Sequence, residues 1–210
     1  QMIATKSTCF VGRGFARAGR LMFLLATLVV ASCGGGAPAF RATDISGTTE
    51  WGRDFALPDA TGRQRRLADF RGKAVVLFFG YTQCPDVCPT TLSAMAEVMK
   101  LLGGDAARLQ VVFVTLDPER DTPALIAEYM AQFHPGFLGL RGDTAATEAV
   151  AREFKVFFTK QAAGKAGGYT LDHTAGSYVF DPQGRLRLYV RHGAPASDIA
   201  ADLSLLLAGK

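Results

Sequence analysis

Two predominantly apolar runs, the first of them unbroken, constrain the fold of this 210-residue chain more than any other feature. Residues 74–79 read Ala-Val-Val-Leu-Phe-Phe, and residues 109–116 contain only two polar side chains, Gln110 and Thr115. Successive side chains of a strand point to opposite faces of a sheet, so a strand that is apolar throughout is buried on both faces. The two runs therefore predict two strands of a sheet that is covered on both faces.

The segments around these strands indicate one mixed α/β domain. Apolar residues at helical spacing run from Leu92 to Leu102, directly before Gly103 and Gly104, and complete a strand–helix–strand unit. The other predicted elements are a hairpin at 55–67, helices at 123–133, 144–154 and 197–207, a short strand at 137–140, and a hairpin at 175–190. An N-terminal hairpin, a βαβ unit, and then an antiparallel hairpin with a last helix is the order of the thioredoxin-like (peroxiredoxin-like) fold class.

Charge is distributed unevenly along the chain, and this excludes one class of partner. The formal net charge is +4, and the four basic residues of the first 32 account for all of it. No acidic residue precedes Cys33, whereas the rest of the chain carries equal numbers of basic and acidic residues. A neutral domain lacks the positive surface that nucleic-acid binding requires, so we expect no nucleic acid among its partners.

The first 32 residues are typical of an export signal. Basic residues precede an apolar run at 21–31, which is shorter than the roughly 20 residues that a membrane-spanning helix needs. Val30-Ala-Ser-Cys33 resembles the lipobox of bacterial lipoproteins, whose cysteine carries the lipid. We expect a signal peptide at 1–32, lipidation of Cys33, a flexible tether at 33–50, and a domain at 51–210 on the periplasmic side of a bacterial membrane. An uncleaved membrane anchor is the alternative, and it also places the domain outside the cytoplasm.

Cys84 and Cys88 are the two cysteines expected in the mature domain, and their spacing points to chemistry. A disulfide between them closes a short loop and adds little stability, which argues against a purely structural pair. The prolines around them favour an exposed turn between strand and helix, with Pro89 at the first helical position and Cys88 at or beside the N-cap. Unpaired N–H groups there stabilise a thiolate, which is both a nucleophile and a metal ligand. The four-residue spacing allows the two sulfurs to form a disulfide or to share a metal ion.

His173 is the candidate for a third ligand. In a thioredoxin-like fold, the loop ahead of the hairpin at 175–190 lies over the cysteine turn, and Asp172-His173-Thr174 occupies that loop. Two thiolates and one imidazole form a soft ligand set that favours copper, especially Cu(I), whereas a further histidine or carboxylate would favour zinc. His134 and His192 have no such placement, and we expect structural roles for them.

The segment Asp117-Pro-Glu-Arg-Asp-Thr-Pro123 follows the second buried strand, at the strand end where functional loops gather. Its acidic residues and Arg120 either form a ligand surface or provide an N-cap and a local ion pair for the next helix. The position of Asp121, two residues ahead of Pro123, favours the cap.

These motifs together resemble the SCO/SenC family over residues 51–207. The resemblance rests on Phe78-Phe-Gly-Tyr-Thr-Gln-Cys-Pro-Asp-Val-Cys-Pro89, on residues 115–123, on Asp172-His-Thr174, and on Tyr178 followed by Asp181-Pro182 and Gly184. It implies a thioredoxin-like domain that binds a copper ion through Cys84, Cys88 and His173, with Cu(I) and Cu(II) both open. Gln83 departs from the family pattern, in which histidine is common before the first cysteine, so no auxiliary-ligand or proton-shuttle role is carried over to it.

The resemblance implies two functions. The first is a copper metallochaperone that helps to assemble the dinuclear copper centre of cytochrome c oxidase, with the copper-centre subunit of the oxidase or another copper protein as its partner. The alternative is a thiol–disulfide oxidoreductase in which Cys84 and Cys88 form the redox pair and reduce cysteines of a copper-protein client. In both cases the lipid on Cys33 would hold the protein at the membrane.

Overall fold

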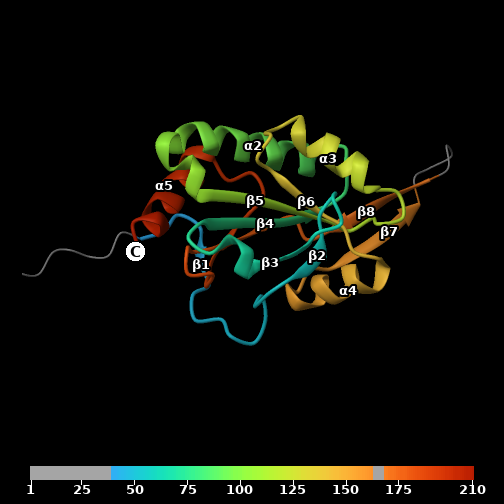
Figure 1. Cartoon of the computed structure of the whole chain (residues 1–210), viewed down its shortest axis with the longest axis horizontal. Coiled ribbons are helices and arrows are strands. Elements are labelled where there is room, and N and C mark those ends of the chain that lie inside the picture. Colours follow the sequence, from blue (N-terminus) through green and yellow to red (C-terminus); the bar gives the residue numbers. More distant parts are fainter. Residues whose placement is uncertain (1–38, 163–167) are drawn as a thin grey trace, which may run out of the picture. The chain divides into compact units, whose positions relative to one another are not determined.

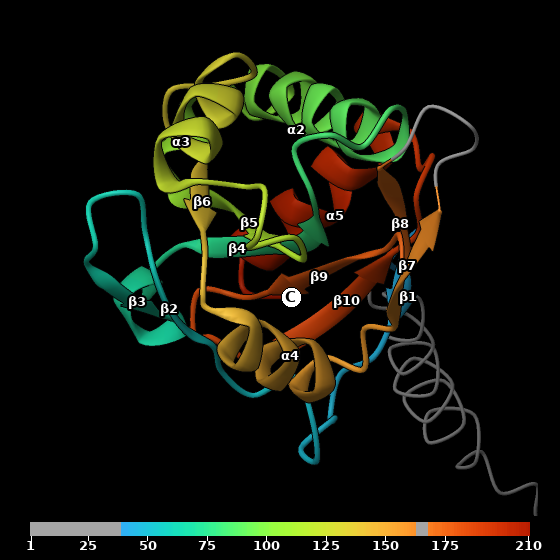
Figure 2. The same ribbon diagram turned by 90° about the vertical axis from the view of Figure 1, so that its right-hand side faces the viewer.

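The computed structural model describes residues 39–162 and 168–210, so the predicted signal peptide and Cys33 lie outside the described residues. A six-stranded mixed sheet has the strand order β1-β10-β9-β4-β5-β6, and Figure 1 and Figure 2 together label its strands. Its strands are β1 (Thr43–Asp44), β4 (Ala74–Gly80), β5 (Leu109–Thr115), β6 (Leu138–Leu140), β9 (Ser177–Phe180) and β10 (Leu186–Val190). β4, β5 and β6 run parallel to one another. β9 is antiparallel to β4, β10 is antiparallel to β9, and β1 is antiparallel to β10.

Helices cover both faces of this sheet (Figure 2). One face carries α2 (Val87–Leu102), α3 (Pro123–Ala131) and α5 (Ala196–Leu207), with the 3-10 helix η2 (Gly103–Arg108) leading into β5. The other face carries α4 (Thr144–Glu153) and a small hairpin of β2 (Ala56–Pro58) and β3 (Gln64–Arg66), followed by the 3-10 helix η1 (Leu67–Phe70). Within residues 39–162 and 168–210, no helix combines the length and the apolar character that crossing a membrane requires.

The two-sided cover explains why the sequence of β4 is apolar throughout. Alternate residues enter different cores: Ala74, Val76 and Phe78 pack with α2 and α5, and Val75, Leu77 and Phe79 pack with α4. None of the six side chains is more than 3% exposed. The predicted strand buried on both faces is confirmed, and the fold agrees with the thioredoxin-like class. The predicted helices and strands also lie close to the observed ones.

A second hairpin, β7 (Phe158–Ala162) and β8 (Tyr169–His173), is missed by the sequence analysis. Leu171 is the one buried residue of these two strands. A hairpin that buries so little shows no alternation of apolar and polar residues, which is the pattern that predicts strands. The structure therefore corrects the placement of His173, which ends a strand opposite Phe158 and does not lie in a loop.

The end of the predicted tether at 33–50 is part of the folded domain. β1 pairs with β10 at the edge of the sheet. Just ahead of it, the backbone N–H groups of Arg41 and Ala42 donate to the carboxylate of Asp202 in α5 at 2.8–3.1 Å. The folded part thus begins ahead of Trp51, because backbone hydrogen bonds hold a segment whose small, polar side chains are typical of a linker.

We expect Asp202→Ala to lower the free energy of unfolding by about 1–3 kcal/mol, because two backbone N–H groups lose a charged acceptor in a buried position. Denaturant unfolding followed by circular dichroism measures this loss. Asp198 lies in the first turn of the same helix and pairs with Arg41 at the surface, so Asp198→Ala is the matched control. It should cost less than about 1 kcal/mol. An equal loss in the two variants would contradict the role assigned to Asp202.

Candidate metal centre

The junction of β4 and α2 places the two cysteines. β4 ends at Gly80, and α2 begins at Val87 with Asp86 as its N-cap. Cys88 therefore lies in the first turn of the helix, and Pro89 is its third residue. The prediction that Pro89 opens the helix is wrong. The proline is tolerated because N–H groups of the first turn have no partner within a helix.

Cys88 lies beneath the turn and Cys84 lies at its surface. Cys88 is 0% exposed, whereas Cys84 is partly exposed. Gly80 allows this burial, since a Cβ atom at that position would collide with Cys88 Sγ. The exposed turn predicted for the pair is therefore found for Cys84 and is wrong for Cys88.

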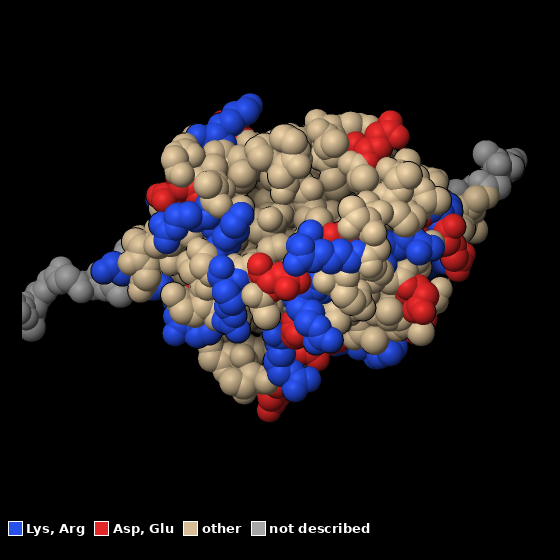
Figure 3. Space-filling view, viewed as in Figure 1, with Lys and Arg blue, Asp and Glu red and all other residues tan. Residues whose placement is uncertain are grey.

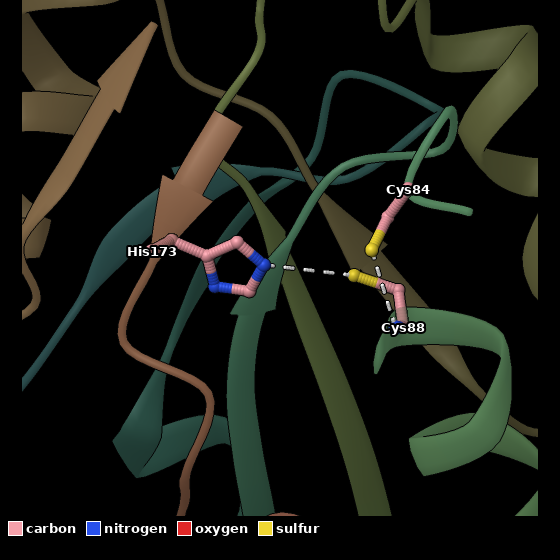
Figure 4. Close-up of side chains that lie close together, drawn as sticks. All are labelled: Cys84, Cys88 and His173. Atoms are coloured by element: carbon pink, nitrogen blue, oxygen red, sulfur yellow. Dashed lines mark hydrogen bonds between the residues drawn. The ribbon is translucent and has the colours of Figure 1, made fainter. Parts of the chain in front are cut away.

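His173 reaches the cysteines from the end of β8 (Figure 4). Its Nε2 atom lies 4.0 Å from Cys88 Sγ, and the ligand atoms of Cys84, Cys88 and His173 all lie within 4.8 Å of one another. Its Nδ1 atom lies 2.9 Å from the carbonyl oxygen of Thr174. A carbonyl oxygen only accepts hydrogen bonds, so Nδ1 carries the proton and Nε2 turns a lone pair toward the sulfurs. The structure thus brings together the three residues that the sequence singled out.

The two thiols differ in acidity. The Cys88 side chain is the main hydrogen-bond partner that lowers the pKa of Cys84 to about 5, and the backbone N–H groups of Asp86 and Cys88 add to the effect. The N–H group of Cys88 lies 3.4 Å from Cys84 Sγ. The same contact with Cys84, followed by burial, raises the pKa of Cys88. The N–H groups at the start of the helix were predicted to favour a thiolate at Cys88, but they act on Cys84.

Asp121 anchors the cysteine turn from within the protein. Its buried carboxylate accepts hydrogen bonds from the backbone N–H and hydroxyl groups of Thr82, at 3.1 and 2.6 Å, and from the hydroxyl of Thr115. The prediction that Asp121 caps α3 is wrong, because Thr122 Oγ1 accepts from the N–H group of Leu125. Asp121 instead ties the loop after β4 to the end of β5.

The remaining histidines lie outside the cluster, and each has a polar contact of its own. His134 Nδ1 accepts from the N–H group of Gly136 at 3.0 Å, and His192 Nδ1 lies 3.3 Å from Thr91 Oγ1. These contacts agree with the structural roles expected for both residues. The side chain of Gln83 has a partner elsewhere, since its Oε1 atom accepts from Arg120 at 3.2 Å.

Tyr81 is a residue of the site that the sequence analysis missed. Its ring packs edge-on against the imidazole of His173, with ring centroids 6.1 Å apart. It is 2% exposed and follows directly on β4. An aromatic residue that follows an apolar strand is expected to pack in the core, so the sequence does not indicate that Tyr81 contacts His173.

The fold and the Cys-Cys-His cluster together define a thioredoxin-like protein with a candidate metal centre. The family model SCO1/SenC matches residues 43–208. The chain therefore belongs to the SCO1/SenC family.

Individual relatives agree with this assignment. The mitochondrial protein SCO2 homolog of Bos taurus is 36% identical over 193 residues, which cover 86% of this chain and 73% of the bovine protein. Among solved structures, Bradyrhizobium japonicum ScoI with copper bound has a TM-score of 0.67 and 38% identity, covering 74% of this chain and 98% of that one. Apo Sco1 from Thermus thermophilus has a TM-score of 0.69 and 40% identity, covering 81% of this chain and 98% of that one.

In the reduced protein, we expect iodoacetamide to modify Cys84 at least about ten times faster than Cys88, because Cys84 is partly exposed and its thiolate is favoured, whereas Cys88 is buried. Peptide mapping by mass spectrometry gives the two rates. The lowered pKa of Cys84 implies that its thiolate persists at pH 6 and is lost as the pH falls through about 5. Cys84→Ser is the control, since it removes the contact that raises the pKa of Cys88 but leaves Cys88 buried, and burial alone should keep its modification slow. Equal rates for the two cysteines in the wild-type protein would contradict the assignment of the thiolate.

Proposed function

We propose that this protein binds one copper ion through Cys84, Cys88 and His173 and transfers it to another copper protein. The observation that carries the proposal is the convergence of two sulfurs and one imidazole nitrogen from separate elements of the fold. A relative of the same family has been solved with copper bound.

The ligand set supports copper over zinc. Thiolates and imidazole are soft ligands that suit Cu(I), and zinc sites usually hold four ligands. Within the part of the chain that the structure describes, the cluster contains no fourth histidine, cysteine or carboxylate. The lowered pKa of Cys84 favours its thiolate before the metal binds, whereas the raised pKa of Cys88 means that this thiol must lose its proton on binding.

A groove beside the cluster supports transfer to a partner. Its volume is about 440 Å³, and residues 84–87 of the cysteine turn and 170–173 of β8 line it together with Tyr81. An incoming ligand of a partner protein has access to Cys84 and His173 from this groove. We infer that the partner is the copper-centre subunit of cytochrome c oxidase or another copper protein. We further propose that a lipid on Cys33 holds the domain on the periplasmic side of a bacterial membrane.

The reduced protein is expected to bind one equivalent of Cu(I), measured by competition with a chromophoric chelator. Cys84→Ser and Cys88→Ser should each abolish tight binding, because two-coordinate binding through one thiolate is much weaker. His173→Ala should lower the affinity about 10- to 100-fold. His134→Ala is the matched control and should leave the affinity unchanged. No copper bound by the wild-type protein would refute the proposed function, and full affinity in His173→Ala would refute the third ligand.

Thiol–disulfide exchange is a second candidate function, favoured by the exposed, acidic Cys84 in front of the buried Cys88. The Cys84 thiolate would attack a client disulfide, forming a mixed disulfide and releasing one client thiolate. Cys88 would then lose its proton and attack Cys84, which forms the intramolecular disulfide and releases the second client thiol. The client gains two electrons and this protein loses them.

The two functions respond differently to the same variants. Exchange needs both cysteines as reacting groups and does not need the imidazole, so His173→Ala should still reduce a disulfide-linked client peptide. Cys88→Ser should accumulate the mixed disulfide, which non-reducing electrophoresis detects. A client that stays oxidised with the wild-type protein would contradict the second function.

A further inference from the structure

Residues 117–121, which follow β5, contact both halves of the metal centre: the cysteine turn and the β7–β8 hairpin that carries His173. Asp121 anchors the cysteine turn through Thr82. Arg120 faces the other half, the β7–β8 hairpin that carries His173. We propose that Arg120 is a positioning residue that fixes β8 against the cysteine turn and so places the imidazole of His173 opposite the two sulfurs. The inference deepens the proposed copper-binding function and rests on it.

The contacts of Arg120 join the two halves through a single side chain. Its guanidinium carbon lies 3.7 Å from the centroid of the Tyr169 ring, at the start of β8. Its Nη1 atom donates to the carbonyl oxygen of Tyr169 at 2.9 Å and to Oε1 of Gln83 at 3.2 Å. Gln83 directly precedes Cys84. One guanidinium group thus contacts the turn that carries the first sulfur and the strand that ends at the imidazole.

Asp117 holds Arg120 in this orientation. Its side chain is 1% exposed and accepts from Arg120 Nε. The same carboxylate accepts from the hydroxyl group of Tyr169 at 2.7 Å. Asp117 therefore fixes both the arginine and the tyrosine that the arginine stacks on. The three groups close a ring of contacts, which is a more rigid link than a single surface ion pair.

Such a link matters to the hairpin because few of its residues are buried. β7 and β8 form a two-stranded sheet apart from the six-stranded one, with Leu171 as their one buried residue. Isolated two-stranded hairpins are marginally stable in water. His173 lies four residues beyond Tyr169 on the same strand, so a contact that fixes the start of β8 also restricts where its end can lie. The ion pair between Lys160 and Glu119 joins the same two segments, but it is exposed and adds little.

A purely electrostatic role is the competing explanation, since a positive charge near the thiolates would favour metal binding by itself. The two explanations differ in their dependence on His173. A positioning role disappears when the imidazole is removed, whereas an electrostatic effect on the sulfurs remains. A double-mutant cycle between Arg120 and His173 separates them.

The test measures the Cu(I) affinity of Arg120→Met in the wild-type and His173→Ala backgrounds. We expect a loss of about tenfold or more with His173 present and of less than about twofold without it, as for other groups that orient a ligand. The matched control is Arg152→Met, an exposed arginine on α4 that pairs with Glu148. It should change the affinity in neither background. Equal losses in both backgrounds, or no loss in either, would overturn the proposal.

A measurement without copper keeps the inference separate from the proposed function. Amide hydrogen exchange of residues 169–173 should be faster in metal-free Arg120→Met than in the metal-free wild-type protein, while exchange in β4 stays unchanged. If the wild-type protein binds no copper, the proposed function fails, and exchange at β8 still tests the link. Unchanged exchange there would overturn it. If Arg120→Met fails to fold, Tyr169→Phe removes only the hydroxyl bond to Asp117 and should show the same dependence on His173 with a smaller loss.

Discussion

The parallel pairing of β4 with β5 is the constraint on which the site depends. It sets Gly80 opposite Thr115, so both strands end at the same edge of the sheet. The loop after β4 carries Cys84 and leads into the first turn of α2, which carries Cys88. The segment after β5 carries the buried carboxylate that anchors this loop. β9 starts at the same edge, with Ser177 opposite Phe78, and the strand before it brings the imidazole. Three segments that are far apart in the sequence therefore meet where these strands of the sheet begin or end.

The sequence was sufficient to predict the two buried strands and the cysteine turn, because both depend on short-range patterns, whereas the proximity of His173 was inferred from the order of elements in the fold. An unbroken apolar run predicts a strand that is buried on both faces, and two cysteines four residues apart indicate that both lie on the same turn. The β7–β8 hairpin was not predicted, because only one of its side chains is buried. Strands are predicted from an alternation of apolar and polar residues, which arises when one face of the strand is buried. The same limit applies to Asp121. A carboxylate two residues ahead of a helix fits an N-cap, and only the neighbouring loop reveals its partners Thr82 and Thr115.

The difference between the two cysteines also lay beyond the sequence. Both flank the same turn, and local rules placed the ionised sulfur at the start of the helix. Which sulfur is buried depends on Gly80, whose missing side chain makes room for Cys88. The result is one exposed, acidic thiol in front of one buried, weakly acidic thiol. This arrangement is compatible with both proposed activities, because metal binding and disulfide formation each remove the proton that Cys88 retains.

The peripheral hairpin makes the three ligands unequal in how easily they separate. Displacing Cys88 would open the core beneath the turn, whereas displacing His173 disturbs one buried leucine and a few contacts at the rim. Of these two proposed ligands, the imidazole is the one held by fewer buried contacts. If copper binds here as proposed, its release would begin at the imidazole, and its residence time would depend on a strand at the periphery more than on the stability of the whole domain.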